Sequence, residues 1–234
     1  MNERSAEFDC TITNWTYVYG LSQDVASAVK AADFEPDVIV ALAPDGWFAG
    51  RCLRDLLGID ELASLKIDPS LEAEAAESIT DALPAERVAD KNVLLVDDIA
   101  DTGGTLSRAA SIVADREASE VRTATLHAID TSDFTPAFFG DRFEDWQWVI
   151  YPWTFTEDMS ELIAGVMTSV ADDRFSTDEI RDHLASFHGI TRAELEMAHP
   201  DRLTEVLAEM DRRDLIEAID ADGEQQWELR ETTN

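Results

Sequence analysis

Residues 93–106 read Val93-Leu94-Leu95-Val96-Asp97-Asp98-Ile99-Ala100-Asp101-Thr102-Gly103-Gly104-Thr105-Leu106, and this stretch decides the fold of the 234-residue chain. Its first four residues are aliphatic, which is typical of a parallel β-strand buried on both faces. Residues 106–114 then have the pattern of a helix, so the polar turn follows the carboxyl end of a strand. Open α/β sheets bind their ligands at this position. The stretch therefore predicts an α/β fold with a ligand site in the turn.

The turn after this strand has the composition of a phosphate site. Gly103 and Gly104 let the backbone approach an anion closely, and the N–H groups at the start of the following helix can hold a dianion. Thr102 and Thr105 add hydroxyl donors. We therefore expect these four residues to bind a phosphate group.

The acid pair Asp97 and Asp98 stands between the strand and this turn. Two carboxylates would repel a phosphate, so they are better placed to accept hydrogen bonds from ribose hydroxyls, directly or through a hydrated Mg²⁺. A plain helix capped at Asp101 or Thr102 leaves the acid pair and the double glycine unexplained. A dinucleotide site fits less well, because the spacing Gly-x-Gly-x-x-Gly is absent. The pattern predicts a sugar-phosphate site with Mg²⁺ as its cofactor.

The composition is strongly acidic, with 50 Asp and Glu against 18 Lys and Arg and a formal net charge of −32. Intact apolar periodicity, six Trp and ten Phe nevertheless indicate a folded core. Charge repulsion of this size is screened in molar salt, where the Debye length is about 3 Å, so we expect a halophilic protein. Two widely separated Cys, no signal peptide and no apolar run of about 20 residues favour a cytoplasmic protein without a membrane span.

The chain changes its periodicity part-way, which predicts two domains. Residues 1–157 alternate strands with helices, as in a parallel sheet flanked by helices on both faces. Residues 158–234 have helical periodicity, a capping box from Ser176 to Glu179 and a hairpin signal at Asp222-Gly223, which suggest a small winged-helix-like module. This module holds seven Arg, no Lys and twenty Asp or Glu, so we expect it to pack or oligomerise rather than to bind DNA.

The opening stretch resembles, over its whole length, the phosphoribosyl-pyrophosphate (PRPP) motif of the type I phosphoribosyltransferases. Within that class, residues 8–155 are most similar to archaeal and bacterial purine phosphoribosyltransferases of the xanthine-guanine type. The resemblance implies the type I phosphoribosyltransferase fold, and Mg²⁺-dependent transfer of 5-phosphoribose from PRPP to a purine base with release of pyrophosphate. It also implies that Asp97, Asp98 and the turn 101–105 bind PRPP, and that the acidic excursion 69–91 carries a mobile catalytic loop.

The base side of the site rests on the pattern Trp-x-x-x-Pro-Trp that begins at Trp148. The family's counterpart of Trp148 stacks on the purine, and the backbone of the next residue, here Val149, reads the base edge. Stacking of this kind contributes about 1–3 kcal/mol. The family's counterpart of Asp101 approaches the purine N7, where a carboxylate can accept or relay a proton as the catalytic residue. The alternative for Trp148 is packing at the sheet edge, and for Asp101 a helix N-cap.

Two positions depart from the family pattern. The pyrophosphate loop after the first strand normally reads Ala-Arg-Gly-Gly, but here it reads Ala43-Pro44-Asp45-Gly46, which should weaken pyrophosphate binding. The lysine that recognises the purine O6 aligns with Ile129, which removes a donor. Lys66, Arg51 or Arg54 could supply the missing positive charge, although each is by default a surface or ion-paired residue.

These features leave two functions open. The first is a purine phosphoribosyltransferase of purine salvage, with PRPP and a purine base or nucleotide as ligands. The second is a sensor of PRPP or nucleotide that signals through its carboxyl-terminal module, because the motif is retained while the pyrophosphate loop is altered. We favour the enzyme and expect a homo-oligomer. Formation of nucleotide from a labelled base discriminates between the two.

Overall fold

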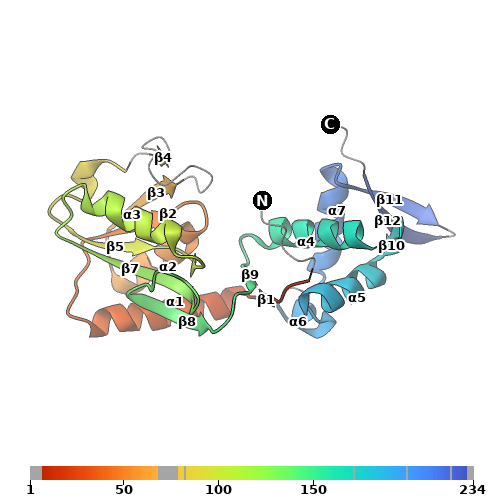
Figure 1. The fold of residues 1–234 in the computed structure, drawn as a ribbon, viewed down its shortest axis with the longest axis horizontal. Helices are drawn as coiled ribbons and strands as arrows, with labels where there is room; N and C mark the ends of the chain where they lie inside the picture. Colours follow the sequence, from red (N-terminus) through yellow and green to blue (C-terminus); the bar gives the residue numbers. More distant parts are fainter. Residues whose placement is uncertain are drawn as a thin grey trace. The chain divides into compact units, whose positions relative to one another are not determined.

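The structure, a computed structural model, describes residues 7–67, 79–81, 83–170, 172–198, 200–221 and 223–230. The chain divides into two compact units, one formed by residues 15–146 and the other by residues 1–14 together with 147–234. Each unit has its own strands and helices (Figure 1). Much of the excursion in which a catalytic loop is expected lies outside the described residues.

The unit 15–146 is built on a seven-stranded sheet in the order β4-β3-β2-β5-β7-β6, with β8 also paired to β7. Among the described residues its strand pairs are parallel, except that β4 is antiparallel to β3. The parallel sheet predicted from the sequence is confirmed, and the aliphatic residues 93–96 lie in its central strand β5. The strands are β2 (Val38–Leu42), β3 (Glu61–Ile67), β4 (Ile79–Asp81), β5 (Asn92–Val96), β6 (Ile99–Ala100), β7 (Glu120–Ile129) and β8 (Phe138–Phe143).

Helices cover both faces of this sheet. Helices α1 (Trp15–Ala31) and α2 (Gly46–Leu57) pack on one face and α3 (Gly104–Ala114) on the other, and a 3-10 turn, η2 (Ala85–Arg87), precedes β5 (Figure 1). The apolar stripe of α1 is buried as its spacing predicts, and α2 ends at Gly58, whose φ is 70°. The core under α3 consists of alternate strand residues with the buried face of the helix, among them Val38, Val40, Val93, Leu95, Leu106, Ala109 and Val113.

The sequence of residues 146–151 predicts one further strand, and a strand is present there, but it belongs to the other unit. Strand β9 (Trp148–Ile150) pairs in parallel with β1 (Cys10–Ile12), and these two form a separate two-stranded sheet. The hydroxyl and the N–H of Thr13 both donate to the carbonyl of Ile150, at 2.9 Å each, which extends the pairing by one residue. The amino-terminal residues thus complete a structure formed mainly by the carboxyl-terminal part of the chain.

The carboxyl-terminal part forms a compact module of four helices and three strands among its described residues. The helices are α4 (Phe155–Ser169), α5 (Thr177–His188), α6 (Arg192–Ala198) and α7 (Arg202–Arg212). The strands β10 (Arg174–Ser176), β11 (Ile216–Ala221) and β12 (Glu224–Leu229) form an antiparallel sheet in the order β10-β12-β11. The predicted hairpin is present, and so is the capping box between Ser176 and Glu179. This small sheet with helices agrees with the winged-helix-like module expected from the sequence.

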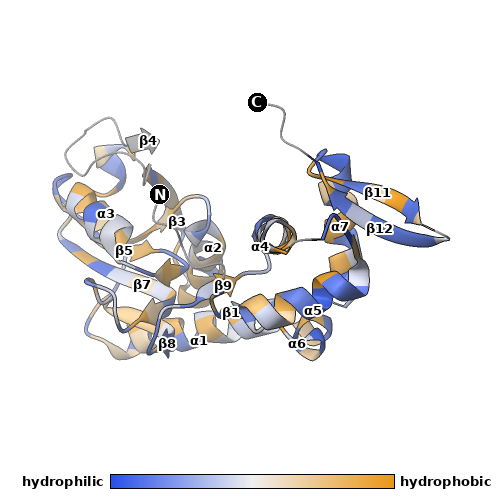
Figure 2. Ribbon diagram, turned by 45° about the vertical axis from the view of Figure 1, so that its right-hand side comes forward, coloured by the Kyte–Doolittle hydropathy of each residue, from blue (hydrophilic) through white to orange (hydrophobic). Residues whose placement is uncertain are grey.

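The hydropathy colouring shows why this module is folded despite its acidity. In Figure 2 the helix α4, seen almost end-on, has an apolar side and a polar side. Its apolar side joins residues from α5, α7 and the sheet in one core that includes Phe155, Met159, Leu184, Met210 and Trp227. No helix in the described part of the chain is long and apolar enough to cross a bilayer.

The division between the units falls before Gln147, whereas the change of periodicity predicts a boundary at residue 157. The physical reason is packing: Ile150 and Phe155 are buried in the same core as α4 to α7, and Trp148 packs against it. Residues 147–157 therefore lie with the carboxyl-terminal module. The sequence pattern missed this because the strand β9 looks locally like one more strand of the larger sheet.

Candidate functional site

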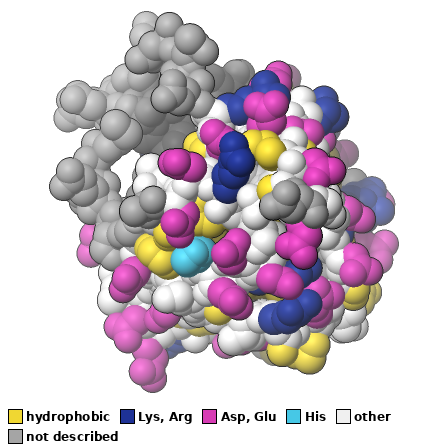
Figure 3. All heavy atoms as spheres, turned by 90° about the vertical axis from the view of Figure 1, so that its right-hand side faces the viewer, with side chains coloured by type: hydrophobic (Ala, Val, Ile, Leu, Met, Phe, Trp, Pro, Cys, Tyr) yellow, Lys and Arg dark blue, Asp and Glu magenta, His cyan; other side chains and the backbone are white. Residues whose placement is uncertain are grey.

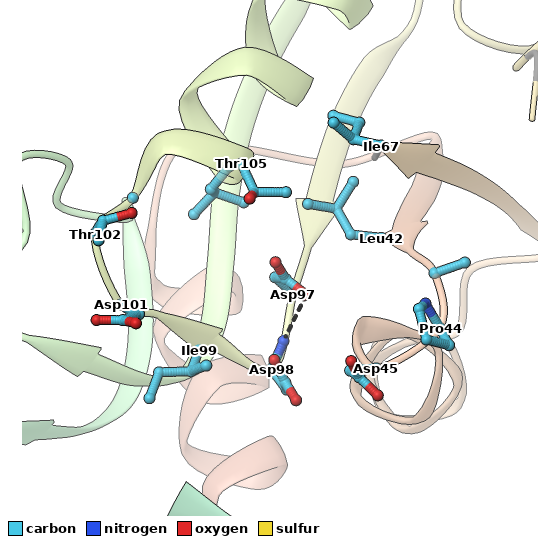
Figure 4. A pocket seen from close by; sticks show the side chains of 13 residues that line it. Leu42, Pro44, Asp45, Ile67, Asp97, Asp98, Ile99, Asp101, Thr102 and Thr105 are labelled. Carbon is cyan, nitrogen blue, oxygen red and sulfur yellow. Dashed lines mark hydrogen bonds between the residues drawn. The ribbon is translucent and has the colours of Figure 1, made fainter. Parts of the chain in front are cut away.

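A pocket of about 310 Å³ opens at the carboxyl edge of the sheet in the unit 15–146 (Figure 4). It collects residues from the ends of β2, β3 and β5 and from the start of α3, as expected for an open α/β sheet. Within the described chain it is lined by Leu42, Ala43, Pro44, Asp45, Ile67, Asp97, Asp98, Ile99, Asp101, Thr102, Gly103, Thr105 and Leu106. The stretch singled out from the sequence thus forms one wall, and the altered loop 43–46 forms the opposite wall.

The turn after β5 leads directly into a helix whose N-cap residue is a glycine. Helix α3 begins at Gly104, and its N-cap is Gly103, with φ 79° and no side-chain capping hydrogen bond. A Cβ on Gly103 would lie 2.4 Å from Cβ of Phe134, so both the φ and the space require glycine. Neither Asp101 nor Thr102 is the N-cap residue, but Oγ1 of Thr102 accepts a hydrogen bond from the N–H of Gly104 at 3.4 Å. The start of α3 lies at the pocket beside the exposed side chains of Thr102 and Thr105, as an anion site requires.

The acid pair is held firmly by the backbone around it. The N–H of Asp98 donates to Oδ1 of Asp97 at 3.1 Å. The carbonyl of Asp98 accepts from the N–H groups of Leu126 and His127 on β7, at 2.9 and 3.0 Å. These bonds hold the side chain of Asp97 and the backbone of Asp98 in place at the carboxyl end of β5.

The electrostatics of the acid pair favour a bound cation. Burial raises the pKa of Asp97 well above its ordinary value, and the negative charges of Asp98 and Asp45 add to this, against the opposing hydrogen bond from the Asp98 N–H. A positive charge at this point would stabilise the ionised form of the carboxylate. By exposed surface Asp97 is half-buried, and Asp98 is buried, with 7% of its surface exposed. The pair thus has the character of a site for a hard cation rather than of a solvated surface.

The altered loop lies directly against this acid pair. Gly46, the first residue of α2, has no space for a side chain, because a Cβ would lie 2.7 Å from the carbonyl oxygen of Val96 and 2.8 Å from Cα of Asp97. The preceding Ala43–Pro44 peptide bond is cis. Asp45 occupies the N-cap position of α2 but makes no side-chain capping hydrogen bond to that helix. Its carboxylate instead faces the pocket (Figure 4).

Among the described residues, no basic side chain near the pocket replaces the positive charge that this loop lacks. Of the three candidates, Lys66 and Arg51 are exposed, and Arg54 donates from Nε to the carbonyl of Asp60 at 3.1 Å. None of them lines the pocket, whose described lining contains four Asp and neither Lys, Arg nor His. The result is a pocket that is negative on two walls.

The oxygen donors suit Mg²⁺, although the protein supplies only part of a coordination shell. Asp45, Asp97 and Asp98 offer hard carboxylate oxygens, which Mg²⁺ prefers. In the described residues, however, no group of three or more His, Cys, Asp or Glu is arranged to hold a metal by itself. Mg²⁺ commonly binds through one or two carboxylates with water and substrate phosphates completing the shell, and this donor set fits that mode.

The predicted base-side residues lie in the other unit. The ring of Trp148 stacks on Phe8 with centroids 5.8 Å apart and an interplanar angle of 20°. Val149 is 8% exposed. Trp148 therefore packs against another side chain of its own unit, which is the alternative role given above. Stacking of Trp148 on a purine stays a prediction. Ile129, at the end of β7, is 3% exposed.

Sequence reasoning missed the apolar side of the pocket. Leu42, Ile67 and Leu106 line it. In Figure 4, Leu42 and Ile67 lie across from Thr105, and Ile99 lies between the acid pair and Asp101. A usable signal was present, because Leu42 and Ile67 are the last residues of two parallel strands and such residues meet at one edge. Ile99 and Ala100, which look like spacers in the sequence motif, form the short strand β6, which pairs in parallel with β7.

Residues 18–154, more than half of the chain, match the sequence model of the phosphoribosyl transferase domain. The chain belongs to this family. The parallel sheet with flanking helices is its fold, and the pocket described above lies within the matched residues.

Solved structures agree with this assignment of a phosphoribosyltransferase domain. A purine phosphoribosyltransferase from Pyrococcus horikoshii is 25% identical and aligns with a TM-score of 0.53 over 62% of this chain and 94% of its own. The xanthine-guanine-hypoxanthine phosphoribosyltransferase of Helicobacter pylori shares the fold, with 14% identity and a TM-score of 0.51 over 64% of this chain and 96% of its own.

A curated relative is similar over a shorter segment. The ribose-phosphate pyrophosphokinase of Haemophilus influenzae is 31% identical over 124 residues, which are 52% of this chain and 36% of that protein. This chain thus spans about a third of the length of that relative, so the similarity concerns the matched segment alone.

Proposed function

We propose that this protein transfers 5-phosphoribose from PRPP to a purine base and releases pyrophosphate, with Mg²⁺ as cofactor. The observation that carries the proposal is the pocket in which the N-terminus of α3, a hydroxyl-rich turn and the acid pair of half-buried Asp97 and buried Asp98 meet. Membership of the phosphoribosyl transferase domain family supports PRPP as the donor. The similarity to a purine phosphoribosyltransferase from Pyrococcus horikoshii supports a purine as the acceptor.

Each part of the pocket has a defined task in this proposal. The N–H groups at the start of α3, with Thr102 and Thr105, bind the 5′-phosphate. Asp97 and Asp98 accept hydrogen bonds from the ribose hydroxyls or hold Mg²⁺, which would neutralise the leaving pyrophosphate when bound. Asp101 takes the proton that the purine loses as the glycosidic bond forms. The chain contributes mainly by holding the sugar and the leaving group in place.

The direct test is formation of nucleotide. The full chain is incubated in molar KCl with Mg²⁺, PRPP and each of several labelled purine bases, and the nucleoside monophosphate is separated and counted. Product with at least one purine supports the enzyme. Tight PRPP binding without product from any base would favour the sensor, which the family comparisons do not favour.

The phosphate assignment predicts that Gly104→Glu abolishes binding of ribose 5-phosphate, with at least a 100-fold loss of affinity. Gly104 is exposed and a Cβ there meets only Oγ1 of Thr102, at 3.7 Å, so the larger side chain fits the fold but places a carboxylate at the anion site. Calorimetric titration measures the loss. Gly104→Ala is the matched control and should keep affinity within about threefold, since it adds no charge. Unchanged binding of ribose 5-phosphate by a folded Gly104→Glu variant would show that the phosphate does not bind at this turn.

The base assignment predicts that Trp148→Ala weakens binding of a purine nucleoside monophosphate about 10- to 100-fold but leaves binding of ribose 5-phosphate within about twofold. The difference corresponds to loss of one stacked base, about 1–3 kcal/mol. Because Trp148 also stacks on Phe8, Phe8→Ala serves as the control for lost packing. If Trp148→Ala weakens both ligands equally, or if Phe8→Ala reproduces its selectivity, Trp148 is a packing residue.

We infer further that the carboxyl-terminal module does not read DNA. Each of its seven arginines lies within ion-pair distance of a carboxylate, as in the pairs Arg212 with Glu209 and Arg230 with Asp214. Acidic side chains are spread among the basic ones on the face shown in Figure 3. Binding to phosphates depends on a basic surface, and with seven Arg against twenty Asp and Glu the segment 158–234 has a charge of 7 − 20 = −13.

A further inference from the structure

We propose that Ser132 and Phe134, on the loop between β7 and β8, are positioning residues that hold the turn 102–105 in the shape that binds a 5′-phosphate. This inference rests on the proposed function, because it concerns the phosphate end of the same pocket. Neither residue belongs to the described lining of the pocket. Each therefore acts through the turn and not by touching the ligand.

The loop closes one side of the turn. Gly103 is buried, although Thr102 and Gly104 on either side of it are exposed. A Cβ on Gly103 would lie 2.4 Å from Cβ of Phe134, 2.8 Å from Oγ of Ser132 and 3.0 Å from the backbone N of Phe134. Packing this close leaves Gly103 no space to move toward the loop.

Hydrogen bonds connect the loop, the turn and the helix in series. The N–H of Asp133 donates to the carbonyl of Thr102 at 3.3 Å. The carbonyl of the next residue, Gly103, accepts from the N–H of Ser107 in the first turn of α3, at 2.9 Å. The loop is therefore linked through the turn to the start of the helix whose N–H groups are assigned to the phosphate.

The loop has a fixed shape of its own. Oγ of Ser132 donates to the carbonyl of Phe134 at 3.0 Å and accepts from the N–H of the same residue at 3.3 Å. The Ser132 N–H donates to the carbonyl of Ile129 at the end of β7, at 3.0 Å, and the Asp130 N–H to the carbonyl of Phe143 on β8, at 2.9 Å. Phe134 is half-buried and packs against the core under α3. One hydroxyl thus sets the position of Phe134 on a loop that two strands anchor.

The turn has few contacts of its own that could fix it. Gly103, with φ 79°, is followed by a second glycine, and glycine loses more backbone freedom on ordering than any other residue. As N-cap, Gly103 makes no side-chain hydrogen bond to α3, and the bond from the Gly104 N–H to Oγ1 of Thr102 is long, at 3.4 Å. Backbone N–H groups bind an anion more tightly when they are ordered before it arrives. The packed loop supplies this order from outside the turn.

The test uses the full chain in 1 M KCl, with ribose 5-phosphate as the ligand in calorimetric titrations. Ser132→Ala should weaken binding about 5- to 10-fold, because both hydrogen bonds to the backbone of Phe134 are lost. Ser132→Thr keeps a hydroxyl and should bind within about twofold of wild type. Thr131→Ala removes the exposed hydroxyl of the neighbouring residue and is the matched control, with affinity also within about twofold.

Amide hydrogen exchange shows whether the effect passes through the turn. In Ser132→Ala the N–H of Ser107 should exchange about fivefold faster than in wild type, because its acceptor is the carbonyl of Gly103. The N–H of Asp115, which is bonded to the carbonyl of Ser111 at the other end of α3, should keep its wild-type rate. A merely structural role of Ser132 would change both rates or neither.

Equal ribose 5-phosphate affinities of Ser132→Ala and Thr131→Ala, or equal changes in exchange at Ser107 and Asp115, would overturn the inference. If ribose 5-phosphate binds to wild type and is lost in Gly104→Glu, the phosphate site stands even when the inference fails. If wild type does not bind ribose 5-phosphate at all, the phosphate assignment fails and the inference fails with it.

Discussion

Gly46→Ala is expected to abolish PRPP binding, with a loss of at least 100-fold, which corresponds to about 3 kcal/mol. A Cβ at this position would lie under 3.0 Å from three atoms, the carbonyl oxygen of Val96, Cα of Asp97 and Oδ1 of Asp97. Two of these belong to the backbone and cannot rotate away, so the loop 43–46 and the acid pair must separate. One methyl group thus disturbs both walls of the pocket at once.

The effect should be specific to the site rather than a general loss of folding. Overpacking of this kind typically costs about 1–3 kcal/mol of stability, which a domain of this size can tolerate. Titration of PRPP with Mg²⁺ measures the binding loss, and circular dichroism checks the fold. Gly20→Ala is the control, because in the described structure a Cβ there would meet no atom within 4 Å outside its own turn of α1, and alanine stabilises a helix interior by up to about 1 kcal/mol. PRPP affinity of Gly46→Ala within threefold of wild type would show that the two walls do not act together.

The parts of the fold that could be predicted from sequence are those with local signals. The run 93–96 and the pattern of residues 106–114 predict a buried strand followed by a helix, and β5 and α3 follow within two residues of the expected bounds. The capping box at Ser176 and the glycine at the end of α2 are equally local, since side chains or φ angles within one turn decide them. Interactions between residues within one turn can be predicted without knowing which contacts the rest of the chain makes.

Features that depend on distant contacts could not be predicted. The residues 148–150 form a strand as expected, but their partner is β1 near the amino terminus, and this pairing moves the boundary of the unit. The requirement for glycine at position 46 arises from Asp97, fifty-one residues later in the chain. For the same reason Asp45 looked only like a loss of charge in the loop, whereas its place across from Asp97 and Asp98 is visible only in the folded chain.

Asp97→Asn should have two opposite effects: loss of PRPP binding in the presence of Mg²⁺, by about 100-fold, and a more stable ligand-free protein at neutral pH. The amide keeps an oxygen that can accept the hydrogen bond from the Asp98 N–H, so the local geometry is preserved. What it removes is a charge that burial, Asp98 and Asp45 all disfavour. Relief of such strain at a functional site typically stabilises by about 1 kcal/mol, or about 2–4 °C in the unfolding temperature.

The stability difference between Asp97→Asn and wild type should depend on pH. The pKa of Asp97 is raised in the folded state, so between the ordinary carboxyl value of about 4 and that raised value the folded protein holds a proton that the unfolded chain has lost. The contribution of Asp97 to stability is therefore fully present at low pH and is lost as the pH rises through the raised pKa. Asparagine does not titrate, so the stability difference between Asp97→Asn and wild type should grow with pH over this range and then level off.

Subtracting wild type from the variant cancels the titration of the many other carboxylates, which both proteins share. Thermal unfolding of the two proteins without Mg²⁺, from pH 4 to pH 8 in molar KCl, measures the difference directly. Addition of Mg²⁺ with PRPP should reverse the order of stability, since ligands that bind only the folded state stabilise wild type and not the variant. A difference that falls with rising pH would contradict the raised pKa of Asp97. A variant that still gains stability from PRPP and Mg²⁺ would show that ligand binding does not need the Asp97 carboxylate.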